Sequence, residues 1–364
     1  MGNIELFDIE KEYDLIVKRV TEKFGYNEDL ANVLRRILPA MLDKKSYEER
    51  SIFYKMLEET PIVVAMEDED ILAKADEMFD GINPHIIDEE EEETVYNKSS
   101  PAGFFRREPI LDENLKLVGK KQAIFIKGLD TSKPQYGPNK ERVELFGTGI
   151  QVSHLIHELG HAWHAQSNGL FQKEDGSVIN RVGNATAENK YIDIGNGQYL
   201  CQAEPFRNLI IEEAMNSDME ETALKRFLGI DDEKLKQLYS SGILIRSNYQ
   251  KSALILLRAA MHFGMGIPLE KYRIFGNEAD LEKTNQLLAR TEWYKTRDSQ
   301  TETSKRKEQI MGILLRGEEI KDDGSIEKIS EDRSKKAEKR KSFARLVRED
   351  FFRKQRKDVS NRIF

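Results

Sequence analysis

The sequence predicts an α+β fold for this chain of 364 residues, and three patterns indicate it. Ile9, Tyr13 and Ile16 begin a run of apolar residues at helical spacing that extends from residue 8 to about residue 60. From about residue 100, short apolar runs bounded by turn residues predict β-strands. An apolar helix with one polar stripe follows at about residues 151–167. Strands followed by a buried helix are typical of the α+β class.

The N-terminal third contains a second helical repeat and then a strongly acidic stretch. The repeat is formed by Leu30, Val33, Leu34 and Leu38, and Pro39 and Pro61 are expected to interrupt the helices. Residues 67–93 are acidic and end in six consecutive acids at 88–93. Because like charges repel, we expect this run to be a mobile loop. It lacks the spaced oxygen ligands of a calcium-binding loop.

The middle of the chain is expected to form short strands. Residues 115–119 and 122–126 flank Lys120 and Lys121, which predicts a hairpin with its turn at the two lysines. Residues 134–138 predict a loop because they contain two prolines and a glycine. Residues 142–146 are expected to form a further strand. These strands lead through a glycine-rich segment into the helix at 151–167, with Gly169 as its expected stop signal.

Downstream, helices are predicted at residues 205–219, 221–228 and 253–261, the last of them a core helix. We expect three regions: an N-terminal helical segment with the acidic loop (1–95), a central domain (96–294), and a charged helical appendage (295–364). The last 34 residues carry 13 Lys/Arg against 6 Asp/Glu. Acids are interspersed among these bases, so a solvated helix is favoured over a surface for nucleic acid or anionic lipid.

Composition limits the location and the class of the protein. The only cysteine, Cys201, excludes an internal disulfide and fits a reducing compartment. The N-terminus has neither a basic region nor an apolar core of a signal peptide, and no run of about 18 apolar residues predicts a membrane span. The expected protein is therefore soluble, and the oligomeric state is left open.

Four of the six histidines lie within eleven residues, at His154, His157, His161 and His164. On a helix these four positions fall within an arc of about 80°. His157, Glu158 and His161 form the pattern His-Glu-x-x-His, which places two imidazoles one turn apart with a carboxylate beside them. This arrangement binds Zn²⁺ through the histidines, while the glutamate acts as a general base on water.

The third zinc ligand is less constrained by sequence. A three-histidine pattern is excluded because Ser167 stands where the last histidine is required and His164 replaces the required glycine. A carboxylate must complete the set, and the candidates are Asp193, Glu204, Glu212 and Glu213. His154 and His164 are expected to flank the site without ligating the metal. Cys201 and His262 are expected to be core residues.

At these motifs the sequence resembles the NleD-like zinc metalloprotease effectors that bacterial pathogens secrete. The resemblance covers about residues 145–250 and is carried by four segments: His157 to Ala162, Glu204 to Arg207, Glu221 to Ile230 and Arg246 to Tyr249. Only the first segment is a specific motif, and Pro205 departs from a family pattern that often has a second glutamate. The resemblance implies a zincin-like domain, with Glu204 as third ligand and Arg246 and Tyr249 stabilising the transition state. It also implies delivery into a host cell by a specialised secretion system.

The resulting expectation is a zinc endopeptidase acting on a protein substrate, which the resemblance implies to be a host protein. The strand expected at residues 142–146 could align an extended substrate by edge pairing. The alternative is a catalytically inactive zincin-fold module that sequesters a protein partner. A third hypothesis assigns the function to the basic tail, although no nucleic-acid partner is expected.

Overall fold

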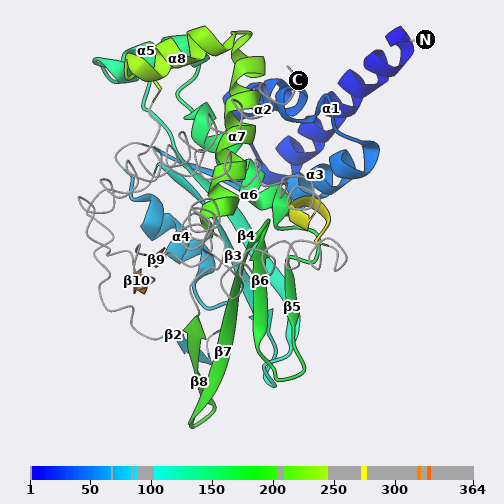
Figure 1. Cartoon of the computed structure of the whole chain (residues 1–364), viewed down its shortest axis with the longest axis vertical. Coiled ribbons are helices and arrows are strands. Elements are labelled where there is room, and N and C mark those ends of the chain that lie inside the picture. Colours follow the sequence, from blue (N-terminus) through cyan, green and yellow to red (C-terminus); the bar gives the residue numbers. More distant parts are fainter. Residues whose placement is uncertain are drawn as a thin grey trace, which may run out of the picture. The chain divides into compact units, whose positions relative to one another are not determined.

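The computed structural model describes residues 2–66, 69–83, 85–88, 102–203, 209–244, 272–276, 318–320 and 326–328. Helices and small sheets share the chain, which confirms the α+β class (Figure 1). Contacts divide the chain into two compact units. The first comprises Met1–Val182, Ala187–Pro205 and Asp218–Ile245, and the second comprises Gly183–Thr186, Phe206–Ser217 and Arg246–Phe364.

Three helices form the N-terminal segment, as the periodicity predicted: α1 (Gly2–Phe24), α2 (Glu28–Leu42) and α3 (Tyr47–Glu59). Asn27 caps α2 and Ser46 caps α3, each by accepting a backbone N–H with its side chain. Pro39 does not interrupt the helix, because α2 continues through it to Leu42. The residues after it are buried in the main core, and this packing offsets the hydrogen bond that proline removes.

A three-stranded sheet of order β1-β4-β3 forms the centre of the first unit. It consists of β1 (Ile62–Ala65), β3 (Gly103–Leu111) and β4 (Leu117–Lys127), with β1 parallel and β3 antiparallel to β4. The side chains of β4 alternate between two cores: Ile124 and Ile126 belong to the main core, whereas Ala123 and Phe125 pack with helix α4 (Ile71–Phe79). Both faces of the sheet are therefore covered, and α4 lies within the acidic stretch at 67–93, before the run of six acids that was expected to be a loop.

The hairpin predicted around Lys120 and Lys121 is wrong, because both lysines lie inside β4. The turn lies at residues 112–116, where the Asp112 side chain accepts hydrogen bonds from the backbone N–H groups of Asn114 (2.9 Å) and Lys116 (2.8 Å). Leu115 completes the turn with a positive φ of 58°. Glu108 stands opposite Lys121 in the register, so a charged residue fits within the strand.

The strand predicted at residues 142–146 is also wrong, because these residues end helix α5 (Pro138–Phe146). Pro138 occupies the start of the helix, where its missing N–H is harmless. Gly147 ends it in the left-handed conformation, with φ of 66°, and donates its N–H to Val143. These two end signals decide the local structure over the alternating pattern between them.

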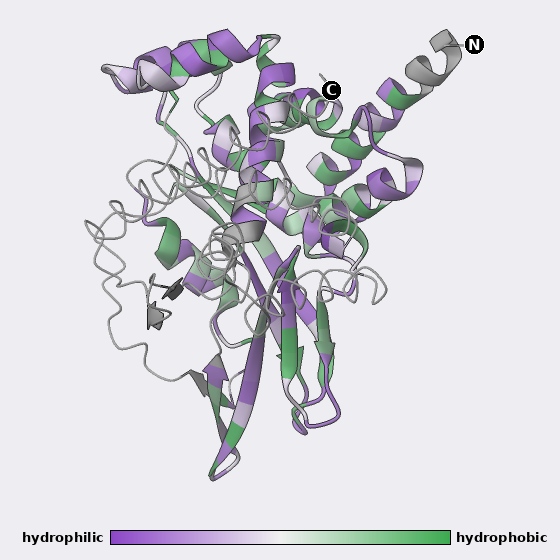
Figure 2. Ribbon diagram, viewed as in Figure 1, coloured by the Kyte–Doolittle hydropathy of each residue, from purple (hydrophilic) through white to green (hydrophobic). Residues whose placement is uncertain are grey.

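A second sheet has the order β2-β8-β7-β6-β5. Its strands are β2 (Ile86–Asp88), β5 (Leu170–Gln172), β6 (Val178–Val182), β7 (Ala185–Gly195) and β8 (Gln198–Ala203). β7 and β8 form a long hairpin, and much of β7 is hydrophilic (Figure 2). Ile192 and Ile194 near its tip are exposed.

The helices predicted at 205–219 and 221–228 are described as one helix, α7 (Leu209–Leu228), followed by α8 (Asp232–Ser240). Within residues 295–364, expected to be helical, the described residues form an antiparallel pair, β9 (Glu318–Ile320) and β10 (Ile326–Lys328). The acidic run from residue 89 and the helix expected at 253–261 lie outside the described residues. Among the described helices, none is long and apolar enough to span a bilayer.

Candidate metal centre

The four histidines lie on helix α6 (Val152–His164), close to the limits predicted. Its apolar side joins the main core, where the Trp163 ring meets the Phe53 ring of α3 edge to face at 5.3 Å. From Leu155 to the end of the helix every residue is buried. A buried helix can keep polar side chains only where they meet polar partners, so the histidine stripe marks a polar contact surface inside the fold.

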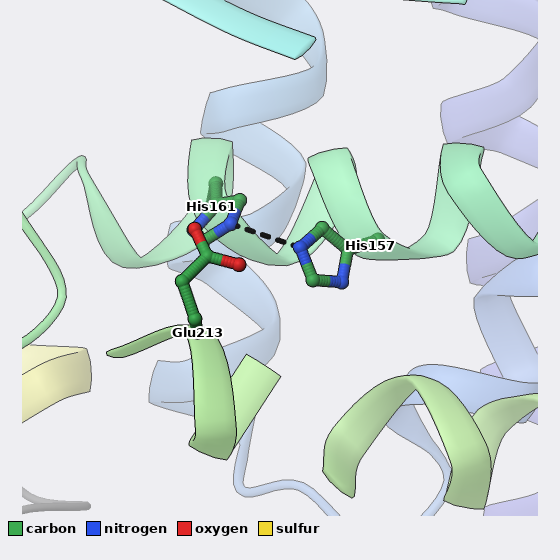
Figure 3. A group of neighbouring side chains, drawn as sticks. All are labelled: His157, His161 and Glu213. Atoms are coloured by element: carbon green, nitrogen blue, oxygen red, sulfur yellow. Dashed lines mark hydrogen bonds between the residues drawn. The ribbon is translucent and has the colours of Figure 1, made fainter. Parts of the chain in front are cut away.

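His157 and His161 face each other across one turn of α6 (Figure 3). Their Nε2 atoms are 3.1 Å apart, and their exposed fractions are only 6% and 8%. Two nitrogens bound to one tetrahedral Zn²⁺ at about 2.05 Å stand about 3.3–3.4 Å apart. The two rings therefore already hold nearly the separation that a shared zinc ion requires.

Glu220 of α7 orients the ring of His157. Its Oε2 lies 3.0 Å from His157 Nδ1, and both side chains are buried. Because the carboxylate accepts a hydrogen bond from Nδ1–H, the ring carries its lone pair on Nε2, the atom through which it could ligate a metal. The sequence did not single out Glu220, which fell between the two helices predicted at 205–219 and 221–228. The seven-residue spacing from Glu213 was the available signal.

Glu213 supplies the third candidate ligand. A ligand atom from each of His157, His161 and Glu213 can be chosen such that all three lie within 4.8 Å of one another, and Figure 3 draws the carboxylate beside both rings. Glu213 precedes Glu220 by seven residues on the continuous helix α7, so the two carboxylates share one helix face about 10.5 Å apart along the axis. Two imidazoles and one carboxylate form a donor set suited to Zn²⁺ with one open position.

The remaining acidic candidates have different surroundings. Glu212 is fully buried in the second unit, where it accepts hydrogen bonds from Arg273 Nε and from the backbone N–H of Asn184, both at 2.8 Å. Asp193 is exposed on β7 and accepts the N–H of Gly195 at 2.7 Å. Neither belongs to the group with His157 and His161. Glu204, Arg246, Tyr249 and His262 lie outside the described residues.

Glu158 lies on α6 beside the start of β3. Its exposed fraction is 7%, and a Cβ added at Gly103 would be 3.5 Å from its Cγ. That Cβ would also be 2.8 Å from the Ile126 side chain, so glycine gives the strand its close approach here. Glu158 is therefore a buried carboxylate that directly follows His157 on α6.

The two flanking histidines differ in environment. His164 is buried and stacks on Trp163 with ring centroids 4.8 Å apart, as expected for a supporting residue. Burial lowers the pKa of His154; Glu220 opposes this shift, whereas His157 and Arg142 reinforce it. His154 is therefore neutral at pH 7. Burial, followed by Glu220, raises the pKa of Tyr239 well above its ordinary value.

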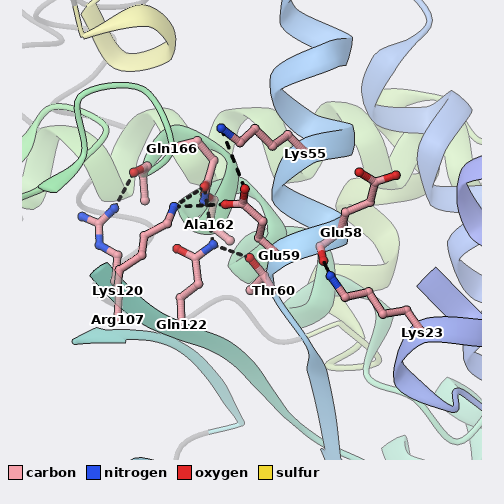
Figure 4. A network of polar contacts seen from close by, with 11 residues as sticks. Lys23, Lys55, Glu58, Glu59, Thr60, Arg107, Lys120, Gln122, Ala162 and Gln166 are labelled. Atoms are coloured by element: carbon pink, nitrogen blue, oxygen red, sulfur yellow. Dashed lines mark hydrogen bonds and ion pairs between the residues drawn. The ribbon is translucent and has the colours of Figure 1, made fainter. Parts of the chain in front are cut away.

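A polar network anchors the C-terminal end of α6 (Figure 4). Lys120 of β4 donates to Gln166 at 2.7 Å and pairs with Glu59 at 3.4 Å. Gln166 donates in turn to the Ala162 carbonyl at 2.6 Å, which closes the last turn of the helix. Gln122 of β4 donates to Thr60 after α3 at 2.7 Å. The helix that carries the histidines is thus held by both the sheet and the N-terminal helices.

Arg107 of β3 secures the segment after α6. It is 5% exposed and donates to the carbonyls of Gly169 (2.7 Å) and Arg181 (2.8 Å), to the Ala165 carbonyl and to the Asn180 side chain. Burial, and then the charge of Arg181, lower its pKa to about 9. A Cβ at Gly169 would collide with the Ala165 carbonyl, so the expected stop glycine is required for close packing, while α6 itself ends at His164.

Cys201 lies half-buried on β8, opposite Tyr191 of β7, and is not part of the group formed by the two histidines and Glu213. The candidate metal centre thus combines a local motif on α6 with two carboxylates of α7, more than fifty residues later in the chain. No protein-family model, curated protein or solved structure matches this chain.

Proposed function

We propose that this protein is a zinc-dependent endopeptidase with a zincin-like domain. The observation that carries the proposal is the pair of Nε2 atoms of His157 and His161, 3.1 Å apart and buried, with Glu220 holding the opposite nitrogen of His157. Packing alone does not require a carboxylate that keeps the proton of His157 on Nδ1 and its lone pair on Nε2. Carboxylate–histidine–metal arrangements use that device.

In this proposal His157, His161 and Glu213 hold the metal. Glu213 replaces Glu204, the ligand that the motif resemblance implied. The support is the geometry of α7: once Glu220 meets His157, helical spacing carries Glu213 to the same face two turns earlier. Glu212 is unsuited because its two oxygens already serve Arg273 and Asn184.

Bound Zn²⁺ would supply Lewis acidity, which polarises a carbonyl and lowers the pKa of water. Glu158 would accept a proton from the attacking water on its carboxylate and pass it to the nitrogen of the leaving amine. Glu220 would keep His157 in the tautomer that can ligate.

A substrate chain could be held by β3 instead of the strand expected at residues 142–146. β3 is an edge strand of the described sheet, and its first residue, Gly103, adjoins Glu158. An extended peptide that pairs with such an edge lies along the catalytic carboxylate. Action on a host protein after secretion belongs to the same proposal and is supported only by the motif resemblance.

The mechanism is tested with Glu158→Gln, which preserves shape and removes the base. We expect zinc content to stay at one ion per chain, while cleavage of a denatured-protein peptide library, read by mass spectrometry, falls by about 10²–10⁴-fold. Glu144→Gln is the matched control, because Glu144 is an exposed acid on α5 paired with Lys140. Undiminished cleavage by Glu158→Gln would reject the mechanism. Zinc binding without cleavage by the unmodified protein would favour the binding module.

The ligand set is tested separately with Glu213→Gln and Glu204→Gln, each measured for zinc per chain after dialysis. We expect Glu213→Gln to lose zinc and Glu204→Gln to keep it. Glu212→Gln distinguishes a structural effect, because it should lower the free energy of unfolding without changing zinc content in the folded fraction. Zinc loss in Glu204→Gln alone would return the ligand role to Glu204.

A further inference from the structure

A second polar site lies at the other end of α6, within the first unit. A hollow that is partly open to solvent is bounded by the start of α6, by α5 and by the segment after α8. Leu129, Phe146 and Leu244 contribute apolar walls, while Arg142, Gln151 and His154 contribute polar groups. The site described above does not use this hollow.

Arg142 brings a positive charge with unused donor capacity to the hollow. Its Nε donates to the carbonyl of Ile243 at 2.5 Å, which fixes the guanidinium against the segment after α8. Its Nη2 is buried and has no hydrogen-bond partner among the described residues. A buried donor without an acceptor lowers stability, so a ligand that accepts a hydrogen bond from Nη2 is favoured.

The N-terminus of α6 adds a second source of positive potential. No side chain caps this helix at Gln151, and Gln151, Ser153 and His154 all line the hollow. The first backbone N–H groups of a helix have no partner within the helix, and the aligned peptide dipoles favour a negative charge there. Arg142 and the helix end therefore act on the same space.

His154 provides a third polar atom. Its Nδ1 is buried without a hydrogen-bond partner among the described residues, and in one tautomer it is a donor. The acid that influences His154 most is Glu220, which is already hydrogen-bonded to His157. Within the described part of the chain, no carboxylate lines the hollow to neutralise Arg142.

We propose that this hollow, which we name the Arg142 pocket, binds a carboxylate carried on a short aliphatic group. The guanidinium matches the planar carboxylate in shape, and the apolar walls suit the attached carbons. One arginine, one neutral histidine and one helix end balance a single negative charge better than a phosphate dianion. His154 precedes His157 by three residues, so the pocket lies about 4.5 Å along α6 from the candidate metal centre. The proposal does not require a bound metal.

The test titrates the full chain with sodium propionate, and with propionamide as its uncharged counterpart, by saturation-transfer NMR in the presence of a chelator. We expect propionate to bind, propionamide not to bind, and Arg142→Gln to weaken propionate at least tenfold. Lys140→Gln is the matched control, because it removes one positive charge from the same helix outside the pocket, and it should change the affinity less than twofold. Equal binding of propionate and propionamide to the unmodified protein would overturn the proposal without relying on a variant's fold.

Further arms separate the sources of the carboxylate. A short peptide with a free C-terminus that competes with propionate, while its amidated form does not, identifies a chain end as the ligand. Competition by an amidated peptide with an internal glutamate, but not by its glutamine version, identifies an acidic side chain. Tighter binding of inorganic phosphate than of propionate, or propionate binding that appears only after zinc is added, contradicts the carboxylate assignment. Either result leaves the endopeptidase proposal untouched.

Discussion

Replacing Glu220 with glutamine tests how the candidate metal centre is organised, because this residue contacts His157, a proposed ligand, and is not itself one of the proposed ligands. The carboxylate lies 3.0 Å from His157 Nδ1, and the two side chains are 9% and 8% exposed, so solvent cannot easily substitute for it. Glutamine can still accept the hydrogen bond from Nδ1–H through its amide oxygen, but it lacks the negative charge that raises the basicity of the ring. Loss of such a partner lowers metal affinity by about 10–100-fold, or about 1.4–2.7 kcal/mol.

Zinc affinity is measured by competition with a calibrated chelator at pH 7.5, and urea denaturation is followed with and without zinc. With zinc in excess, the increase in the free energy of unfolding that zinc causes should be smaller in Glu220→Gln by about 1.4–2.7 kcal/mol. A ligand that binds only the folded state stabilises that state in proportion to the logarithm of its affinity. The control is Asp218→Asn, which removes an exposed acid from the same helix. Zinc affinity of Glu220→Gln within twofold of the unmodified protein would refute the orienting role.

Three further substitutions test the scaffold around the site. Arg107→Met should lower the free energy of unfolding by about 3 kcal/mol, because it removes a donor from three buried carbonyl groups, of which that of Gly169 keeps a second donor, the backbone N–H of Arg181. A loss below about 1 kcal/mol in urea denaturation would contradict this. Ser46→Ala should lower it by about 1 kcal/mol at pH 7 through loss of the α3 cap. Burial raises the pKa of Glu49, but hydrogen bonds from Ser46 and the charge of Lys45 outweigh this effect and hold the pKa below its ordinary value. The contribution of Glu49 to the free energy of unfolding should therefore be present above pH 4.5 and disappear as the pH falls through the lowered pKa. Denaturation at pH 3 and at pH 7 measures this difference. Asp112→Ala should lower stability by about 1 kcal/mol by removing the acceptor that closes the β3–β4 turn, whereas Lys120→Ala, at the originally predicted turn, should leave that turn intact.

The residues that α6 contributes to the candidate metal centre could be predicted from the sequence, because their signal is local. His157, Glu158 and His161 are fixed relative to one another by helical spacing, and the apolar residues between them show which side is buried. Glu213 and Glu220 could only be placed among candidates, because their meeting with α6 depends on packing between elements more than fifty residues apart. Spacing along one predicted helix would have linked them, but the pattern was divided at residue 220.

The errors in the sheet have a similar origin. Lys120 and Lys121 are polar residues between apolar runs, a pattern typical of a turn, yet their partners in the fold are Gln166, Glu59 and the carbonyl of Met78. Such tertiary contacts are invisible in a local pattern. The strand predicted at residues 142–146 is wrong for the opposite reason. Pro138 and Gly147 are local signals for the start and end of a helix, and they outweigh the alternating pattern between them.

Helix α7 carries both carboxylates on a single rigid rod, which ties their positions together. Inserting one residue between Glu213 and Glu220 would swing one of them by about 100° and shift it by about 1.5 Å, while leaving the other in place. Either acid can therefore be substituted without moving the other, whereas an insertion or deletion between them changes their relative placement. An ion bound by Glu213 would also stabilise the first turns of α7, so the helix content of this segment should increase with metal occupancy.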